Sequence, residues 1–406
     1  MVDIISENHC RNILLQQNPS FSFKSFDVKP LVQESLGGLM GLHYILRISY
    51  MHNAVLHTLQ LFVKTLNNQN KIMYKISREL LFYEKEALFF MKLIPEYEKN
   101  GINVAFAPNA YFCGDYAIVL EDLTVSGFKL FPKEEPMDIE HCYACLATLA
   151  EFHASSMIYE ISKSKSMGTK YSLLEDQADV LKDLIFSGGD TYGDKYVQES
   201  VRALLALAEL EFDDSSSLET LKNVFSSTEP TGYGDLCCVL LHGDLWSNNF
   251  LHKYDGKEIS ESKLIDFQTI KYGPPCLDVI QLIYTNTRIS LRKQHFTELI
   301  SYYYRKLEDI FSERALQLQD YLPKDQFFES CETFKLQIKL QAVIDRCLTA
   351  IPDEIHQKTT SDEEKFYDFI FVNRSKYLVD YYLNIPKYRE LVSEDLIELR
   401  DMLSNL

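Results

Sequence analysis

The sequence VLLHGDLWSNNF occupies residues 239–250, and KLIDFQ follows at residues 263–268. Short apolar runs flank a polar loop that begins with Asp-Gly, which is the pattern of a β-hairpin. On such a hairpin, Asn249 at the start of one strand faces Asp266 at the end of the other. Amide and carboxylate oxygens are ligands that Mg²⁺ accepts together with phosphate. The spacing therefore predicts that Asn249 and Asp266 bind a magnesium ion.

Asp244 lies on the loop just before this hairpin. A carboxylate there can orient a hydroxyl nucleophile and accept its proton during in-line phosphoryl transfer. The spacing His-x-Asp-x-x-x-x-Asn, followed by Asp-Phe-Gln, is the catalytic-loop and metal-loop pair of the protein-kinase-like fold. The alternative is that Asp244 and Asp266 only cap turns. We favour the catalytic interpretation because other parts of that fold occur in the expected order.

Two alternating runs at residues 42–50 and 54–66 predict a first pair of strands joined by a tight turn at His52-Asn53. Gly37, Gly38 and Gly41 lie immediately before them, where backbone N–H groups could approach a phosphate. A plain hairpin turn would explain the same glycines.

Lys64 is close to the end of the second of these strands, where its ammonium could reach nucleotide phosphates. A solvated edge lysine is the alternative interpretation. The following residues, 76–94, have a helical pattern that Pro95 is expected to end. Glu86 on this helix is the predicted partner of Lys64, with two rivals left open by the sequence. Those rivals are Glu79 and Glu84.

A second hairpin is predicted from residues 111–113 and 116–120, with a turn at Gly114-Asp115. Glu121 and Leu123 follow its last strand, and their backbone groups could hydrogen-bond an adenine edge. Beyond this point the pattern becomes helical, with Asp138 as the N-cap of a helix running to about Tyr159.

The remaining chain is expected to be loop-rich over residues 162–194 and helical over residues 196–224 and from residue 278 onward. The predicted fold is therefore α+β, with a small strand-rich lobe over residues 1–123 and a larger, mainly helical lobe over residues 124–406. A length of 406 residues also favours two domains.

The composition restricts the partners. With 41 basic and 59 acidic residues the formal net charge is −18, which argues against nucleic acid and acidic membranes. We find no signal peptide and no membrane span. The nine cysteines lack the spacing of a disulfide framework, so we expect reduced thiols in the cytoplasm. Cys142 and Cys145 form a C-x-x-C on a helical pattern, which favours core packing over a zinc site.

Several segments resemble the ecdysteroid kinase-like family of insects, within the choline kinase and aminoglycoside phosphotransferase group. The resemblance covers roughly residues 30–330. Its segments are IVLEDL (118–123), LAEFHASS (149–156), HGDLWSNN (242–249), IDFQ (265–268) and YGPPCLD (272–278). Met40, Leu42 and His43 depart from the more polar residues expected in the glycine loop.

The resemblance implies a two-lobed, protein-kinase-like enzyme that uses ATP and Mg²⁺. Asp244 would be the catalytic base, and Asn249 and Asp266 the metal ligands. Lys64 would bind phosphate with Glu86 as its partner, since the segment EALFF at residues 86–90 is similar to the family's helix signature. The same resemblance makes two further residues supports of the catalytic loop. These are His242 and Asp278.

We therefore expect a phosphotransferase that acts on a hydroxyl of a small, apolar molecule, either an ecdysteroid or related steroid alcohol, or a xenobiotic. The 25 Tyr and 25 Phe fit an apolar acceptor. One alternative is a choline- or aminoglycoside-type kinase of a polar alcohol, and another is a non-catalytic carrier on a kinase scaffold. No obligate protein partner is inferred. Trp246, the single tryptophan, either packs its loop or forms a wall of the acceptor site.

Overall fold

The structure is a computed structural model that describes residues 5–31, 40–132, 135–185, 190–227, 233–360 and 362–406. Its contacts divide the chain into two units. Unit 1 comprises Met1–Phe131 and Asn248–Gln268, and unit 2 comprises Pro132–Ser247 and Thr269–Leu406.

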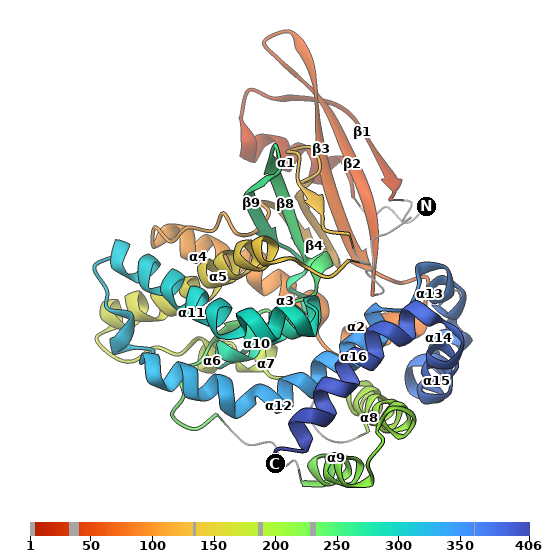
Figure 1. The fold of residues 1–406 in the computed structure, drawn as a ribbon. Helices are drawn as coiled ribbons and strands as arrows, with labels where there is room; N and C mark the ends of the chain where they lie inside the picture. Colours follow the sequence, from red (N-terminus) through yellow and green to blue (C-terminus); the bar gives the residue numbers. More distant parts are fainter. Residues whose placement is uncertain (1–4, 32–39, 133–134, 186–189, 228–232, 361) are drawn as a thin grey trace. The chain divides into compact units, whose positions relative to one another are not determined.

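Unit 1 is built on a five-stranded antiparallel sheet with the order β1-β2-β3-β5-β4 (Figure 1). The strands are β1 (Ser22–Pro30), β2 (Gly41–His52), β3 (Val55–Leu66), β4 (Ala110–Gly114) and β5 (Ala117–Glu121). The N-terminal helix α1 (Glu7–Gln17) packs Ile13 and Leu14 against the sheet, in one buried cluster with Leu46 and Val63. Neither α1 nor β1 is predicted by the sequence patterns.

Both hairpins of this sheet are confirmed, but each turn lies one residue later than expected. Asn53 and Ala54 join β2 to β3, and Asp115 and Tyr116 join β4 to β5. All four residues have positive φ angles between 50° and 62°. Two consecutive left-handed residues match the right-handed twist of the flanking strands, so geometry selects these turns even without glycine.

A second sheet of unit 1 carries the hairpin predicted from the Asp-Gly loop. Its order is β6-β8-β9, with β6 (Lys129–Leu130), β8 (Phe250–Asp255) and β9 (Glu258–Leu264). Strand β6 pairs with β8, and residues 124–131 and Asn248–Gln268 both belong to unit 1. The domain boundary between residues 123 and 124 stays a prediction.

The single helix predicted over residues 76–94 is wrong. The structure has α2 (Lys71–Glu79), α3 (Phe82–Leu88), a π-helical turn (Phe89–Leu93) and α4 (Ile94–Lys99). Leu81, with φ +58°, breaks the helix between α2 and α3. Pro95 does not end a helix but begins α4, because the first turn of a helix needs no backbone N–H from proline.

Unit 2 is mainly helical. Its elements are α5 (Ile139–Met167), α6 (Leu173–Asp176), α7 (Ala178–Leu181), α8 (Tyr192–Glu211), α9 (Ser215–Ser227), β7 (Val239–Leu241), β10 (Lys271–Gly273), α10 (Cys276–Asn286), α11 (Ile289–Glu313), α12 (Lys324–Thr349), α13 (Asp353–Thr360), α14 (Glu363–Phe371), α15 (Arg374–Asn384) and α16 (Pro386–Leu403). Helix α5 packs on α11, α10 on α12, and α12 on α16 (Figure 1). Strands β7 and β10 pair, and β7, which contacts α5, is followed directly by the predicted catalytic loop at residues 242–247. The predicted α+β class, strand-rich first and helical afterwards, is confirmed.

The helix predicted from Asp138 begins as expected, with the Asp138 carboxylate accepting from the His141 backbone N–H. It continues to Met167, however, and ends at Gly168 with φ +70°. Residues 162–194 are therefore less loop-rich than expected, and α6, α7 and the start of α8 also lie in this range. Polar serines and lysines on the exposed face of α5 resemble a loop in sequence although the backbone is helical.

The cysteines are thiols, and all nine lie in the described part of the chain. Cys142 and Cys145 are fully buried in α5. Among the described helices, none has the length and apolar composition needed to cross a membrane.

Candidate functional site

The most distinctive charge arrangement of unit 1 is a lysine held between two carboxylates. Lys64 on β3 places its Nζ 2.7 Å from Glu86 Oε2 on α3 and 2.6 Å from Asp266 Oδ1 after β9. The Glu86 side chain is 2% exposed, whereas Asp266 is 20% exposed. Glu84, a sequence-level rival, binds Arg78 instead. We call Lys64, Glu86 and Asp266 the lysine site.

The charges of the lysine site shift its pKa values. Burial alone would lower the pKa of the Lys64 ammonium, but the charges of Asp266 and Glu86 outweigh burial and raise it above its usual value. Burial raises the pKa of Glu86, and the nearby Lys64 ammonium opposes that rise. Lys64 is therefore a fixed cation at every physiological pH.

The hairpin brings Asn249 next to the chain segment that carries Asp266. Phe250 pairs with Leu264, and the Ile265 N–H donates to the Asn249 carbonyl at 2.9 Å. Asp266 itself has φ +65°, a left-handed conformation that is uncommon for a residue with a side chain. The next residue, Phe267, stacks on Phe89 of the π-helical turn with ring centroids 3.8 Å apart, which fixes the chain directly after Asp266.

The start of β2 lies against Lys64. A Cβ atom added at Gly41 would stand 3.2 Å from the Thr65 carbonyl oxygen and 3.6 Å from Lys64 Cε, so glycine allows this close approach. Opposite Lys64 on β2 is His43. Burial, and then the charge of Lys64, lower the pKa of His43 to about 4. The expected phosphate-loop residues Gly37 and Gly38 lie outside the described residues.

The residues after β5 form a tight turn. Glu121 binds the Asn109 side chain through Oε2 at 3.0 Å, and the Leu123 carbonyl accepts the N–H groups of Ser126 and Phe128. The Leu123 carbonyl already accepts hydrogen bonds within the turn. A hydrogen bond from Leu123 to an adenine edge would therefore come from its N–H group. The roles of Glu121 and Leu123 stay predictions.

In unit 2, the catalytic loop is held by Asp278 at the start of α10. The Asp278 carboxylate accepts the His242 N–H at 2.7 Å and the Gly243 N–H at 3.1 Å, and it is 2% exposed. Gly243 has φ +79°, and a Cβ atom there would meet the Thr269 carbonyl oxygen at 2.9 Å. His242 Nδ1 accepts the Asp244 N–H at 3.3 Å. His242 and Asp278 thus fix the backbone on which Asp244 stands.

A further layer beneath this loop is only partly visible in the sequence. His153, on α5, lies between Asp278 Oδ2 at 3.1 Å and the Tyr303 hydroxyl at 2.6 Å, and it is fully buried. Burial raises the pKa of Asp278, but the hydrogen bonds and charge of His153 and the backbone donors lower it below its usual value overall. The helical stripe correctly indicates a buried His153, but no sequence signal indicates its link to Tyr303.

A lysine between two carboxylates in a strand-rich unit, and a clamped loop that presents an aspartate in a helical unit, are the features of a small-molecule phosphotransferase. The comparison with protein families leads to the same class. A model of the ecdysteroid kinase-like family matches residues 40–316, which is more than half of the chain, so the protein belongs to this family. The predicted family and the predicted kind of enzyme are confirmed.

Solved structures with a similar chain path have low sequence identity. The Plasmodium vivax ethanolamine kinase Pv091845 has 13% identity and a TM-score of 0.42, over 92% of this chain and 84% of that chain. A putative aminoglycoside phosphotransferase of Ralstonia eutropha has 12% identity and a TM-score of 0.43, over 98% of both chains. A choline/ethanolamine kinase family protein of Mesorhizobium loti has 14% identity and a TM-score of 0.35, over 91% and 92%. No curated protein sequence matches the chain.

Proposed function

We propose that this enzyme transfers a phosphoryl group from ATP, with Mg²⁺, to a hydroxyl of a small and largely apolar molecule. An ecdysteroid or related steroid alcohol, or a xenobiotic of similar character, is the proposed acceptor class. The observation that supports this most directly is the lysine site, because a half-buried ammonium fixed by two carboxylates is a preformed binding group for nucleotide phosphates. A simple carrier would need no such group.

The residues proposed for the metal fit a magnesium ion. Mg²⁺ typically uses one or two protein carboxylates together with substrate phosphates and water, rather than a complete protein cage. Asp266 would supply a carboxylate oxygen and Asn249 an amide oxygen. The bound ion would neutralise charge on the phosphates.

Asp244 is the proposed catalytic base. Its carboxylate would accept the proton of the acceptor hydroxyl as that oxygen attacks the transferred phosphoryl group. Asp278 and His242 would act as positioning residues, since they hold the loop backbone through hydrogen bonds of 2.7–3.3 Å. Gly41 and the glycines before it would cover the phosphates. The free thiols agree with a reducing compartment, and we propose a cytoplasmic enzyme.

Replacing Asp244 by Asn tests the chemistry directly. We expect phosphoryl transfer to fall by about 10²–10⁴-fold, because removal of a positioned base costs that much. The unfolding temperature should stay within a few degrees, since the side chain is partly exposed and an amide fills the same space. A screen of steroid and plant-derived alcohols, with mass spectrometry for one added phosphoryl group, supplies the assay. Full activity of D244N would refute its role as base.

Replacing Asp266 by Asn tests the metal site. Calorimetry of ATP binding with and without Mg²⁺ should show that Mg²⁺ strengthens binding to the natural protein by at least tenfold, and much less to the variant. Replacing Asp255, an exposed residue of the same hairpin, by Asn is the matched control and should leave the metal effect unchanged. Equal Mg²⁺ dependence in D266N and the natural protein would exclude Asp266 as a ligand.

A further inference from the structure

Unit 2 contains a cavity of about 210 Å³ next to the catalytic loop. Trp246 and Ser247 of the loop form one side, and the end of α10, the α12–α13 turn and the start of α16 form the others. Asn286, which also lines the cavity, donates from Nδ2 to the Leu245 carbonyl at 2.7 Å. The cavity wall is therefore tied to the residue that follows Asp244. Ile351 and Tyr388 add apolar surface to the lining.

Thr285 gives this cavity an unsatisfied polar group. Its side chain lines the cavity and is 4% exposed, and its Oγ1 atom has no hydrogen-bond partner among the described residues. A buried hydroxyl without a partner is costly, and native proteins rarely keep one without a reason. A ligand oxygen in the cavity would supply the missing hydrogen bond.

Arg346 gives the cavity a fixed cation. Its Nε donates to Asp395 Oδ2 at 3.0 Å, and its side chain is 13% exposed. Within the described chain, Nε makes the only hydrogen bond of this guanidinium, so the outer nitrogens keep their donors for a ligand. Asp395 thus orients a rigid fork that favours oxygen acceptors such as a carbonyl or carboxylate.

The other charges of the cavity lie further out or are engaged elsewhere. Lys387 and Glu135 are exposed at the rim and of opposite sign. Asp353 is half-buried beside them. Asp345, next to Arg346 on α12, is outside the cavity lining and accepts a hydrogen bond from Gln281 at 3.4 Å. The charge held deepest in the cavity lining is therefore the guanidinium of Arg346.

We infer that this cavity is the acceptor pocket and that Arg346 and Thr285 select the acceptor. The pocket takes an alcohol that also carries a neutral or anionic oxygen acceptor, such as a ketone or a carboxylate, and it disfavours a cationic amine. This inference rests on the proposed phosphotransferase activity and narrows its acceptor class. It separates the protein from kinases of amino alcohols, whose acceptors would place a positive charge beside Arg346.

The size of the cavity limits what it encloses. Ligand pockets for drug-sized molecules hold about 300–1,000 Å³, so 210 Å³ accommodates one end of such a molecule.

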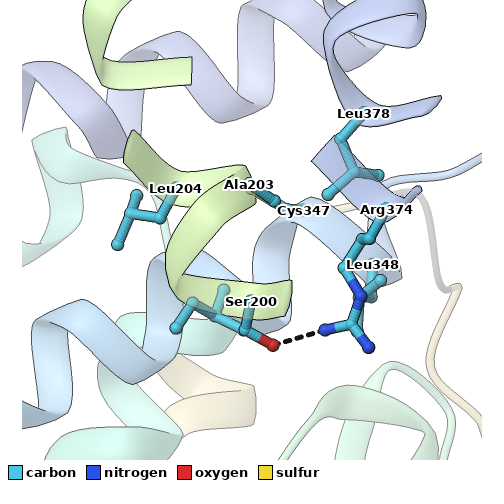
Figure 2. Close-up of a pocket in the computed structure, with 8 residues that line it drawn as sticks. Ser200, Ala203, Leu204, Cys347, Leu348, Arg374 and Leu378 are labelled. Atoms are coloured by element: carbon cyan, nitrogen blue, oxygen red, sulfur yellow. Dashed lines mark hydrogen bonds between the residues drawn. The ribbon is translucent and has the colours of Figure 1, made fainter. Parts of the chain in front are cut away.

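A smaller cavity between α8, α12 and α15 is shown in Figure 2, where the dashed line joins buried Arg374 to Ser200 Oγ. This smaller cavity has a volume of about 10 Å³, so it holds at most one water molecule and excludes any organic acceptor.

The single tryptophan makes the inference testable without catalysis. Trp246 lines the cavity, so its fluorescence reports occupancy. Four benzyl alcohols with different para substituents serve as probes: 4-(hydroxymethyl)acetophenone, 4-(hydroxymethyl)benzoate, 4-(hydroxymethyl)benzylamine and unsubstituted benzyl alcohol. We expect the ketone and the carboxylate to bind at least tenfold more tightly than the amine, with benzyl alcohol between them. Equal or tighter binding of the amine, or no binding of any probe, would overturn the inference.

Three variants assign the preference to residues. Thr285→Val, which preserves shape, should weaken ketone binding by about fivefold, while Thr285→Ser keeps it. T285V should also unfold at the same or a higher temperature, because it removes an unpaired buried hydroxyl. Arg346→Gln should weaken carboxylate binding by about 10–100-fold and abolish discrimination against the amine. Unchanged affinities in folded T285V would refute the assignment even if R346Q failed to fold.

The matched controls change a threonine and an arginine that do not line the cavity. Thr333→Val removes an exposed hydroxyl on α12, and Arg288→Gln breaks ion pairs between the start of α11 and α16. Neither should change the affinity of any probe. Phosphoryl transfer to the four probes is then measured separately. Selective binding without transfer would refute the proposed function but not the pocket, whereas transfer with no preference would refute the pocket alone.

Discussion

Two buried charge clusters, one in each unit, have opposite balances. The lysine site of unit 1 has one cation for two carboxylates, and Asp266 remains 20% exposed. The α16 ion network of unit 2 comprises Arg292, Lys339, Arg346, Asp395 and Glu398, with three cations for two carboxylates. Lys339 in this network is completely buried, 2.7 Å from Asp395 and 2.6 Å from Glu398.

The difference in balance separates two uses of buried charge. Excess carboxylate with partial exposure suits a site that receives a divalent cation and a phosphate. Excess cation around a buried carboxylate suits a structural junction: it lowers the pKa of Asp395, although burial alone would raise it. Helices α11, α12 and α16 meet at this junction. One of its cations, Arg346, also lines the cavity, where the outer nitrogens of its guanidinium keep their donors for a ligand. Mutations in the two clusters should therefore fail in different ways.

The largest expected effect is on activity, from Lys64→Arg. The charge and both ion pairs can be kept, but a planar guanidinium does not replace a compact ammonium at phosphate oxygens. We expect phosphoryl transfer to fall by about 10²–10³-fold, as for loss of one preorganised transition-state donor. The unfolding temperature should change by only a few degrees. Steady-state kinetics and thermal unfolding on the same sample check both parts.

An exposed lysine on another strand of the same sheet provides the control. Lys29→Arg alters a solvent-exposed pair with Asp27 and should leave kcat and KM unchanged. If K64R kept most of its activity, the lysine site would be structural, and the contrast between the two clusters would disappear.

The second expected effect is on stability, from Lys339→Met. This change removes the buried ammonium that donates to both carboxylates, Asp395 at 2.7 Å and Glu398 at 2.6 Å, and about 3–5 kcal/mol of unfolding free energy should be lost. Lys365→Met removes an exposed pair with Asp362 on α14 and should cost less than about 1 kcal/mol. Urea denaturation measures both. A loss below 1 kcal/mol in K339M would show that the network contributes little to stability.

The lysine site and the network also differ in how far the sequence predicts them. The two strands of each predicted hairpin are close in sequence, so the alternation of apolar and polar residues indicates them well. The order of motifs pairs Lys64 with Glu86, and the two side chains form an ion pair of 2.7 Å. The left-handed turns at Ala54 and Tyr116 carry no glycine, so their positions were one residue off. The helix break at Leu81 is likewise not predicted, because a leucine gives no indication in the sequence that it adopts a φ of +58°.

The network and the acceptor pocket could not be predicted because their residues are distant in sequence. Arg292 and Asp395 are 103 residues apart, and Arg346 and Asp395 are 49 apart. The packing of α11 and α12 on α16 brings them together. Trp246 was a candidate pocket wall from its loop position, but Thr285 and Arg346 lie on ordinary helical patterns. Tertiary packing, rather than local propensity, creates their chemistry.

The smallest expected effect concerns pH and the single cation of the lysine site. His43 faces Lys64 across β2 and β3, and burial with the Lys64 charge lowers its pKa to about 4, from about 6.5 in an unfolded chain. The nearby Asp266 charge opposes this shift only in part. Since the folded protein binds the proton less readily, His43 contributes stability above pH 6.5, and this contribution is lost as pH falls toward 4.

Replacing His43 by Asn should therefore flatten the pH dependence. Between pH 7.5 and pH 5 the natural protein should lose about 1–2 kcal/mol more unfolding free energy than H43N. His295→Asn, at a half-buried position on α11 beside Glu298, is the control and should keep the natural slope. If the unfolding free energy of H43N depended on pH as strongly as that of the natural protein, the Lys64 charge would not lower the pKa of His43. The lysine site could then hold two cations in acid, and its excess of carboxylate, the feature that distinguishes it from the α16 ion network, would be lost at low pH.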